Sequence, residues 1–199
     1  MWWILIALLY IAFDINYFIR VTFTLVLDVF SARNLKLLDT SVSYGICTTQ
    51  DIDLFLNHMN NARFLRELDF ARYHWYGRTR FWDALKVGGA TMVQGAATIR
   101  YRKMMPIWRP FRVETRLIWW DERSLFLEQR FVSLGDGFVR AVAICRQPIV
   151  GANLGDVMAD FEQNKHKPEP PPVEIRHWLD AIEESSLKLR IETQGMLFS

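Results

Sequence analysis

The alternation of apolar and polar residues divides the chain into an apolar N-terminal segment, one amphipathic helix, a series of strands and a C-terminal helix. Apolar residues recur at helical spacing over 62–76, directly after Asn60 and Asn61, and either asparagine can cap a helix. This helix is predicted to stop at Gly77, because glycine often ends helices. The strand-forming residues at 44–49 predict a strand before it.

From Ala90 onward, apolar and polar residues alternate with the period of two that is typical of half-exposed strands. The clearest case is FRVETRLIWW at 111–120, and the turn-forming stretches DERS (121–124) and GDG (135–137) separate the runs that follow. Four consecutive antiparallel strands are therefore predicted. Because the apolar face of such a sheet must be covered, and the central helix is available to cover it, the pattern predicts an α+β fold.

The N-terminal segment has the composition of a membrane element. Residues 1–13, MWWILIALLYIAF, carry no charged side chain. A spanning helix needs about 20 predominantly apolar residues, and an acid near its centre costs about 2.5 to 3.5 kcal/mol. The polar residues that follow fall on one helical face, which can lie in the membrane interface: Asp14, Tyr17, Arg20, Thr24 and Asp28. An uncleaved anchor over 1–30 is predicted, with a cleaved signal sequence or a buried helix of a soluble domain as alternatives.

Basic residues around that segment predict its orientation. Arg20, Arg33 and Lys36 follow the apolar block, so the positive-inside rule places the C-terminal domain in the cytosol. The expected location is a membrane, that of the endoplasmic reticulum, and the chain would be secreted if the N-terminus were cleaved. The predicted organisation is an anchor (1–30), a connector (31–43), a main domain (44–150), and C-terminal helices with a Pro-rich spacer (151–199).

Composition and charge exclude several function classes. Hydrophobic residues make up 51% of the chain, too many for a disordered protein, and a net charge of +2 is too small to indicate nucleic-acid binding. The basic segment 100–116 indicates either a solvated strand face or an anionic partner. Cys47 and Cys145 lack the spacing of metal ligands and are predicted to be buried free thiols, so no metal or other cofactor is implied.

The stretch DIDLFLNHMNNARFLRELDFAR (51–72) resembles the hotdog-fold thioesterase superfamily, of the 4-hydroxybenzoyl-CoA thioesterase-like kind. It is similar to that family's Asp-rich turn, its His-x-Asn-Asn segment and the helix that the sheet wraps. Together with DERSLFLEQRFVSLGDGFVRA (121–141) and the apolar N-terminus, it resembles the thioesterase superfamily member 6 group. The resemblance implies a hotdog domain over 44–150, with a curved antiparallel sheet around the central helix, and a homodimer.

The resemblance also implies the site residues. Asp53 matches the catalytic aspartate, which acts as general base or nucleophile, and His58 matches the assisting histidine. N–H groups at the helix start would polarise the thioester carbonyl. The residues expected to bind substrate are Asn57, Met59, Asn60, Asn61 and Asp69.

The turn departs from the Asp-x-Asn-x-His pattern of plant acyl-carrier-protein thioesterases with this fold. Phe55 stands at the Asn position and one extra residue precedes His58, so Asn57 is the candidate replacement. Other interpretations stay open: Asp53 can form a turn or a helix cap, and His58 can be a structural hydrogen-bonding residue. Asp51 is expected to be solvated.

Hydrolysis of fatty acyl thioesters by a membrane-tethered protein is the function that the resemblance implies, with coenzyme A or an acyl carrier protein as the carrier. The basic segment 100–116 would then hold the anionic carrier. Two alternatives belong to other classes. One is a non-catalytic binder or sensor of acyl thioesters, and the other is a membrane-resident interaction protein on a hotdog scaffold.

Overall fold

A computed structural model describes residues 2–30, 35–55, 57–159, 161 and 170–197. Its contacts divide the chain into two units, residues 1–165 and 166–199. The helices of the first unit are α1 (Trp2–Ala12), α2 (Ile15–Phe30), α3 (Asn61–Arg78), α4 (Phe81–Val87) and α5 (Leu154–Ala159). Its strands are β1 (Ser41–Ile46), β2 (Thr91–Met92), β3 (Ala96–Tyr101), β4 (Pro110–Trp120), β5 (Ser124–Ser133) and β6 (Val139–Val150). The second unit contains α6 (Val173–Leu197).

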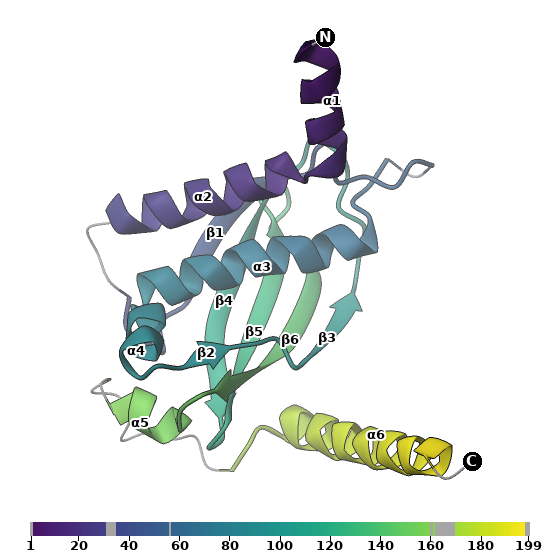
Figure 1. The fold of residues 1–199 in the computed structure, drawn as a ribbon. Helices are drawn as coiled ribbons and strands as arrows, with labels where there is room; N and C mark the ends of the chain where they lie inside the picture. Colours follow the sequence, from purple (N-terminus) through teal and green to yellow (C-terminus); the bar gives the residue numbers. More distant parts are fainter. Residues whose placement is uncertain (1, 31–34, 56, 160, 162–169, 198–199) are drawn as a thin grey trace. The chain divides into compact units, whose positions relative to one another are not determined.

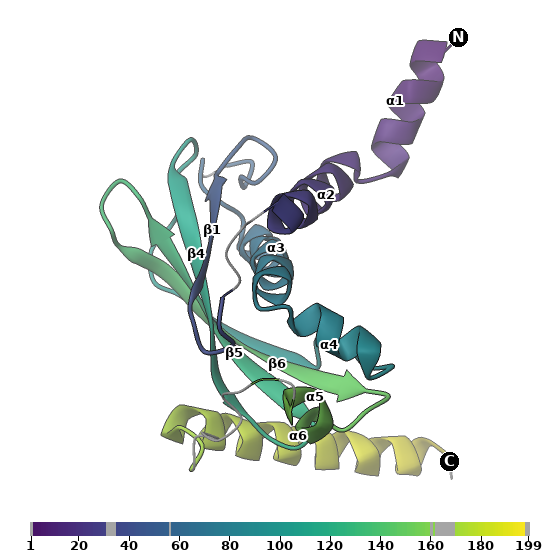
Figure 2. The same ribbon diagram turned by 90° about the vertical axis from the view of Figure 1, so that its left-hand side faces the viewer.

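The strands form one antiparallel sheet in the order β1-β4-β5-β6-β2, and β3 also pairs with β6. The sheet curves, and α3 lies on its concave side (Figures 1 and 2). The four predicted strands are β3 to β6, and the two predicted turns connect β4 to β5 and β5 to β6. The prediction of an α+β fold with a curved sheet around a central helix is therefore confirmed.

Helix α3 packs against the sheet through a stripe of large side chains. Phe64 and Leu68 are buried in a cluster with Phe111 and Phe131 of the sheet, beneath the first half of the helix. Trp75 and Tyr76 are buried in a second cluster, beneath the second half, which also contains side chains of α4 and α5. Burial of each such side chain stabilises the fold by about 1.5 to 3 kcal/mol.

Two sequence predictions about element boundaries need correction, and two elements were not predicted. The central helix does not stop at Gly77 but continues to Arg78, because the N–H of Thr79 still bonds to the carbonyl of Trp75. The first strand begins at Ser41, since residues 41–46 pair with β4, so it takes in the end of the predicted connector. Helix α4 and the two-residue β2 were not predicted. Residues 31–34 of the connector, and 162–169 around the start of the Pro-rich spacer, lie outside the described residues.

The N-terminal segment forms two helices rather than one anchor helix over 1–30. Helix α1 ends at Ala12 and α2 starts at Ile15, and between them a carboxylate oxygen of Asp14 accepts from the N–H of Tyr17 at 3.1 Å. Because Asp14 provides this acceptor at the start of α2, it favours a new helix start over a continuous helix. Within the described residues, no helix combines the length and the apolar character needed to cross a membrane.

Helix α2 packs with its polar side toward the protein. Tyr17 and Arg20 are half-buried against α3, where the Tyr17 and Phe70 rings lie 5.4 Å apart and the Arg20 guanidinium lies 4.6 Å from the same Phe70 ring. The opposite side carries exposed apolar side chains: Phe18, Ile19, Leu25 and Val26. A helix on a soluble domain usually has the reverse arrangement, so the outer side of α2 is an unusually apolar surface.

Candidate functional site

The residues before α3 form a short antiparallel ribbon. Ile52 bridges to Met59, and the backbone N–H of Asp53 donates to the carbonyl of His58 at 2.9 Å. Residues paired in this way project their side chains to the same face of a ribbon. The structure therefore brings Asp53 and His58 together, as opposite members of one pair.

The two acids of this turn have different surroundings. Asp53 is half-buried, and its Oδ1 accepts from the N–H of Phe55 at 3.3 Å. Asp51 is only 8% exposed, and its Oδ2 accepts from the N–H of Thr48 at 2.9 Å and from the Thr48 hydroxyl at 2.8 Å. The expectation that Asp51 is solvated is therefore wrong: its carboxylate closes the turn that follows β1. Of the two acids, Asp53 is the more accessible to a reactant.

The start of α3 is capped as the sequence predicted. Asn60 has extended backbone angles (φ −63°, ψ 142°), and its side chain accepts from the N–H of Ala62 at 2.9 Å. Asn61 is the first helical residue, and its carbonyl accepts from the Tyr101 hydroxyl at 3.0 Å. Among the described residues, no acceptor is recorded for the N–H of Asn61. This N–H, together with the partial positive charge of the helix start, can stabilise a developing oxyanion.

Asn57 and Met59 hold the ribbon against the loop before β4. Asn57 adopts a left-handed backbone conformation (φ 49°), which asparagine tolerates better than most residues, and its carbonyl accepts from the N–H of Ile107 at 3.1 Å. Met59 is fully buried, and its N–H donates to the carbonyl of Met105 at 2.8 Å. The extra residue of this turn is thus accommodated by a local left-handed bend.

A cleft of about 260 Å³ opens beside the start of α3. We call it the helix-start cleft. His58, Met59, Asn61 and Phe64 form one side of it, and residues 101–104 form the other. The sequence did not single out Tyr101 or Phe64, although Tyr101 falls inside the basic segment 100–116. Asp53 is not among the cleft-lining residues. It lies next to the cleft because its backbone pairs with that of His58, which does line it.

Two basic side chains gather at the mouth of this cleft. The cationic groups of Arg102 and Lys103 lie 4.9 and 5.4 Å from the centre of the Phe138 ring. Arg140 lies 5.5 Å from the same ring, and its guanidinium donates to the carbonyl of Met104 at 3.2 Å. Cation–π contacts of this kind hold flexible basic side chains close to one position. The helix-start cleft therefore combines an apolar floor, a histidine and a positively charged rim.

Asp69 lies apart from this site, more than two turns along α3. It pairs with Arg72, whose guanidinium reaches beneath the helix to Gln129 at 3.1 Å and to the thiol of Cys145 at 3.4 Å. Burial raises the pKa of Asp69, and Arg72 partly offsets that effect. Asp69 is not among the cleft-lining residues, so its contribution to substrate binding stays a prediction. Cys47 and Cys145 are buried free thiols, as predicted.

Comparison with protein families and curated sequences gives consistent results. The family described as the thioesterase-like superfamily matches residues 47–179. "Protein THEM6" of Drosophila melanogaster is 47% identical over 189 residues, which cover 95% of this chain and 97% of that protein. "Protein THEM6" of Xenopus laevis is 37% identical over 189 residues, covering 95% of this chain and 91% of that protein.

Solved structures share this fold. A probable thioesterase of Escherichia coli, YbaW, superposes with a TM-score of 0.56 at 20% identity, covering 61% of this chain and 96% of that one. The Staphylococcus aureus protein SAV2348, solved in complex with CoA, superposes with a TM-score of 0.53 at 15% identity, covering 71% of this chain and 95% of that one. At these identities the likeness shows the fold.

Proposed function

Because the chain belongs to the thioesterase-like superfamily, we propose that it binds fatty acyl thioesters of an anionic carrier in the helix-start cleft and hydrolyses them. These matches confirm the resemblance to the thioesterase superfamily that the sequence indicated. One observation carries the proposal: a helix start, His58 and the Arg102–Lys103 pair converge on one cleft. The similar fold of a protein solved in complex with CoA supports coenzyme A as the carrier.

The proposed chemistry uses the groups of the ribbon and the helix start. The Asp53 carboxylate accepts a proton from a water molecule, whose oxygen attacks the thioester carbonyl, and His58 assists by orienting that water. The N–H groups at the start of α3 stabilise the negative charge on the carbonyl oxygen. The C–S bond then breaks, the thiol leaves with a proton, and the acyl group leaves as a carboxylic acid. Arg102 and Lys103 hold the phosphates of the carrier.

Release of coenzyme A from a chain-length series of acyl substrates tests this proposal, with wild type compared to Asp53→Asn. Loss of a general base lowers turnover by about 100-fold or more. His177→Asn, in the second unit of the chain, is a matched control and should leave turnover unchanged. Equal turnover of wild type and Asp53→Asn would remove this carboxylate from the mechanism.

A non-catalytic binder of acyl thioesters is the second candidate function. It is favoured by the hydrogen bond that Asp53 already accepts from the N–H of Phe55, and by the absence of Asp53 from the lining of the cleft. Tight binding of a non-hydrolysable acyl-CoA analogue without turnover of acyl-CoA would select this function. Lys103→Ala should weaken that binding and should make it less dependent on salt.

We also propose that the N-terminal helices contact a membrane. Trp2 and Trp3 are 78% and 81% exposed, and α1 has no charged residue. The outer side of α2 extends this apolar surface, and tryptophan is enriched at membrane interfaces. In this proposal the domain lies on the cytosolic side of the endoplasmic reticulum membrane. Release by carbonate extraction would contradict tight insertion, and protease protection of the domain in sealed vesicles would contradict its orientation.

Homodimer formation through β3 is a further part of this proposal. Within the part of the chain that the structure describes, strand β3 pairs with β6 on one side and has no partner strand on its other edge. Exposed edges of this kind promote pairing with a second chain. Analytical ultracentrifugation of wild type and Ala97→Pro tests it, because proline at this exposed position removes a backbone donor from the outer edge of the strand. Equal masses for the two proteins would exclude β3 as the contact.

A further inference from the structure

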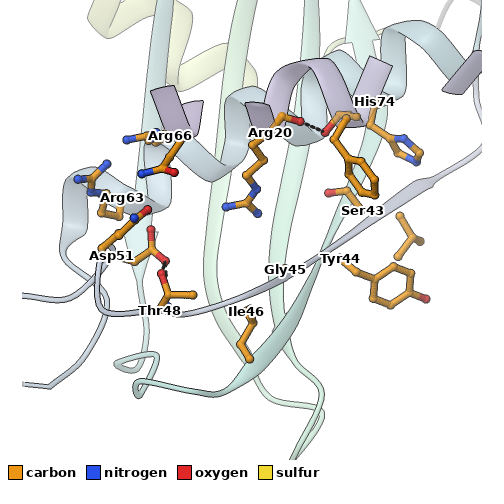
Figure 3. A pocket seen from close by; sticks show the side chains of 15 residues that line it. Arg20, Ser43, Tyr44, Gly45, Ile46, Thr48, Asp51, Arg63, Arg66 and His74 are labelled. Carbon is orange, nitrogen blue, oxygen red and sulfur yellow. Dashed lines mark hydrogen bonds between the residues drawn. The ribbon is translucent and has the colours of Figure 1, made fainter. Parts of the chain in front are cut away.

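A second and larger cleft, of about 550 Å³, opens between α2, β1 and α3 (Figure 3). We call it the α2–β1 cleft. Its walls come from α2 between Asn16 and Thr24, from β1 between Val42 and Ile46, and from the nearby face of α3. It shares no lining residue with the helix-start cleft. Its volume falls within the range of small-molecule sites, about 300 to 1,000 Å³.

The floor of the α2–β1 cleft is fixed by an ion pair between half-buried Arg20 and buried Glu67. The Arg20 guanidinium crosses β1 and makes two hydrogen bonds to the carboxylate of Glu67, whose side chain is 3% exposed. The crossing point is Gly45, where an added Cβ would lie 2.5 Å from the Phe111 ring and 2.9 Å from the Arg20 guanidinium. Glycine is required there, because any side chain would displace one of these two groups. The floor of the cleft is therefore held in place by specific contacts of the fold.

Charges along the cleft are unevenly neutralised. Arg66 pairs with Asp14 at 2.7 Å, and Oδ2 of Asp51 accepts two hydrogen bonds from Thr48. Arg63 also lines the cleft and is half-buried. Its charge acts on Asp14, but within the described residues the direct ion pair of Asp14 is to Arg66 and not to Arg63. Figure 3 shows Arg63 and Arg66 above the turn that holds Asp51 and Thr48. This end of the cleft thus carries a cation that can take an anionic group.

The other end of the cleft carries the apolar side chains of Phe23 and Val42 beside His74. Phe23, on α2, is 62% exposed. It lies nine residues after Asp14, the partner of Arg66, and nine residues of helix span about 13 Å. Val42 lies on β1 four residues before Ile46, again about 13 Å along a strand. Both side chains line the cleft, so it runs from a basic end to an apolar end. This is the arrangement that a single-chain amphiphile with a charged head would match.

We propose that the α2–β1 cleft binds a single-chain anionic lipid, with its carboxylate or phosphate at Arg63 and its aliphatic chain along Phe23 and Val42. The apolar outer side of α2 continues from the wall of this cleft, so a chain can enter from a lipid surface in contact with α2. The site is separate from the helix-start cleft. Binding here therefore does not depend on thioester hydrolysis.

Photo-crosslinking of the full chain in nanodiscs tests the proposal. Three probes share a twelve-carbon chain with a terminal diazirine and differ in their head group: a carboxylate, a phosphate or an uncharged alcohol. The expected result is labelling of residues 42–46 or of Phe23 and Thr24 by at least one anionic probe, at least tenfold above the alcohol. Labelling by the carboxylate alone indicates a fatty acid, and labelling by the phosphate alone indicates a phospholipid-derived head group.

Variants make the test specific. Arg63→Ala should lower labelling at least fivefold, Arg63→Lys should restore most of it, and Ser43→Phe should lower it by filling the cleft from β1. Arg116→Ala, whose arginine pairs with Glu128 on the sheet, is the matched control and should leave labelling unchanged. Unchanged labelling in Arg63→Ala, or equal labelling by the alcohol, would overturn the proposal.

The enzymatic assay separates this proposal from the proposed function. Asp53→Asn should leave the labelling unchanged, and Arg63→Ala should leave acyl-thioester turnover unchanged. If turnover is lost in Asp53→Asn but no labelling is found, only the lipid site is overturned. If labelling is found but no variant turns over thioesters, only the hydrolase proposal is overturned.

Discussion

The two clefts of this molecule differ in how far apart in the sequence their residues lie. The helix-start cleft is built on one side by consecutive residues, 58–64, and its apolar floor, its cap and its helix start all follow from that local stretch. The α2–β1 cleft joins α2, β1 and α3 through the pairs Arg20–Glu67 and Asp14–Arg66, which are 47 and 52 residues apart. One side of the first cleft is therefore predictable from a motif, whereas its other side, residues 101–104, and the whole of the second cleft are not.

The two clefts also differ in the use of charge. At the helix-start cleft the basic side chains are exposed at the rim, where a soluble anionic carrier can reach them. At the α2–β1 cleft, buried Glu67 pairs with half-buried Arg20. Half-buried Arg63 lies near Asp14, whose direct ion pair is to Arg66. A site for a soluble substrate and a site for a lipid would be expected to differ in this way. The variants that follow alter one cleft and leave the other as the control.

The largest effect on stability is expected for Arg20→Ala, at the floor of the α2–β1 cleft. Removing the half-buried cation of an ion pair leaves the buried acid without its partner and costs about 2 to 3 kcal/mol. The carboxylate of Glu67 would be left in that state. Urea unfolding in detergent measures the loss. Arg116→Ala at a more exposed pair should cost less than about 1 kcal/mol, and similar losses in both variants would contradict the structural role of Arg20.

Each cleft contains one histidine, which allows a matched pair of variants. His58 lines the helix-start cleft and His74 lines the α2–β1 cleft. His58→Ala should lower acyl-thioester turnover by about 100-fold, since that is the scale of lost assistance in proton transfer. His74→Ala should change turnover less than about twofold, since it changes only a surface outside the reacting site. Steady-state release of coenzyme A measures both. A larger loss of turnover in His74→Ala than in His58→Ala would indicate that the reaction takes place in the α2–β1 cleft.

A smaller effect is expected from the titration of Glu67. Burial raises the pKa of this carboxyl group from 4.5 to about 7, although Arg20 and Arg66 lower it and Asp51 raises it further. Between those two values the folded protein holds a proton that the unfolded chain has released. Stability should therefore fall as the pH rises from 4.5 through 7. The decrease expected between pH 5 and 8 is about 2 kcal/mol.

The control for that titration is Glu67→Gln, which cannot ionise. Unfolding free energies of wild type and variant, measured across the same pH range, isolate the contribution of this one group from the other titrating residues. The variant curve should be flatter than the wild-type curve over that window. Parallel curves would show that Glu67 is already ionised at the lower pH and that Arg20 fully compensates its burial.

Much of the fold could be predicted because its signals are local. The alternation at 111–120 and the turns at 121–124 and 135–137 depend only on neighbouring residues, and the corresponding strands are all present. The cap at Asn60 is likewise a local signal. The prediction that the helix stops at Gly77 was wrong because glycine costs only about 1 kcal/mol inside a helix. That cost is offset by the burial of Trp75 and Tyr76 beside it.

The charged core residues of α3 could not be predicted. Glu67 and Arg72 are 3% and 6% exposed, yet the sequence pattern would place both on a solvated face. Glu67 pairs with Arg20, which lies in the segment assigned to a membrane anchor. Arg72 bonds beneath the helix to Gln129, which lies on β5. Burial of such groups depends on long-range pairing, and hydropathy patterns carry no information about it. The polar side of α2 was interpreted as membrane-interfacial for the same reason.

The smallest effect concerns Asn60, which caps α3 beside the helix-start cleft. Asn60→Ala removes the acceptor for the N–H of Ala62 and should cost about 1 kcal/mol of unfolding free energy. Asn61→Ala is the matched control and should stay within about 0.5 kcal/mol, because the Asn61 contact recorded to Tyr101 uses its backbone carbonyl. Thermal unfolding of both variants measures the difference. The cap also fixes the N–H groups that are proposed to bind the oxyanion, so Asn60→Ala should lower turnover more than Asn61→Ala. The opposite order would show that the helix start does not take part in the reaction.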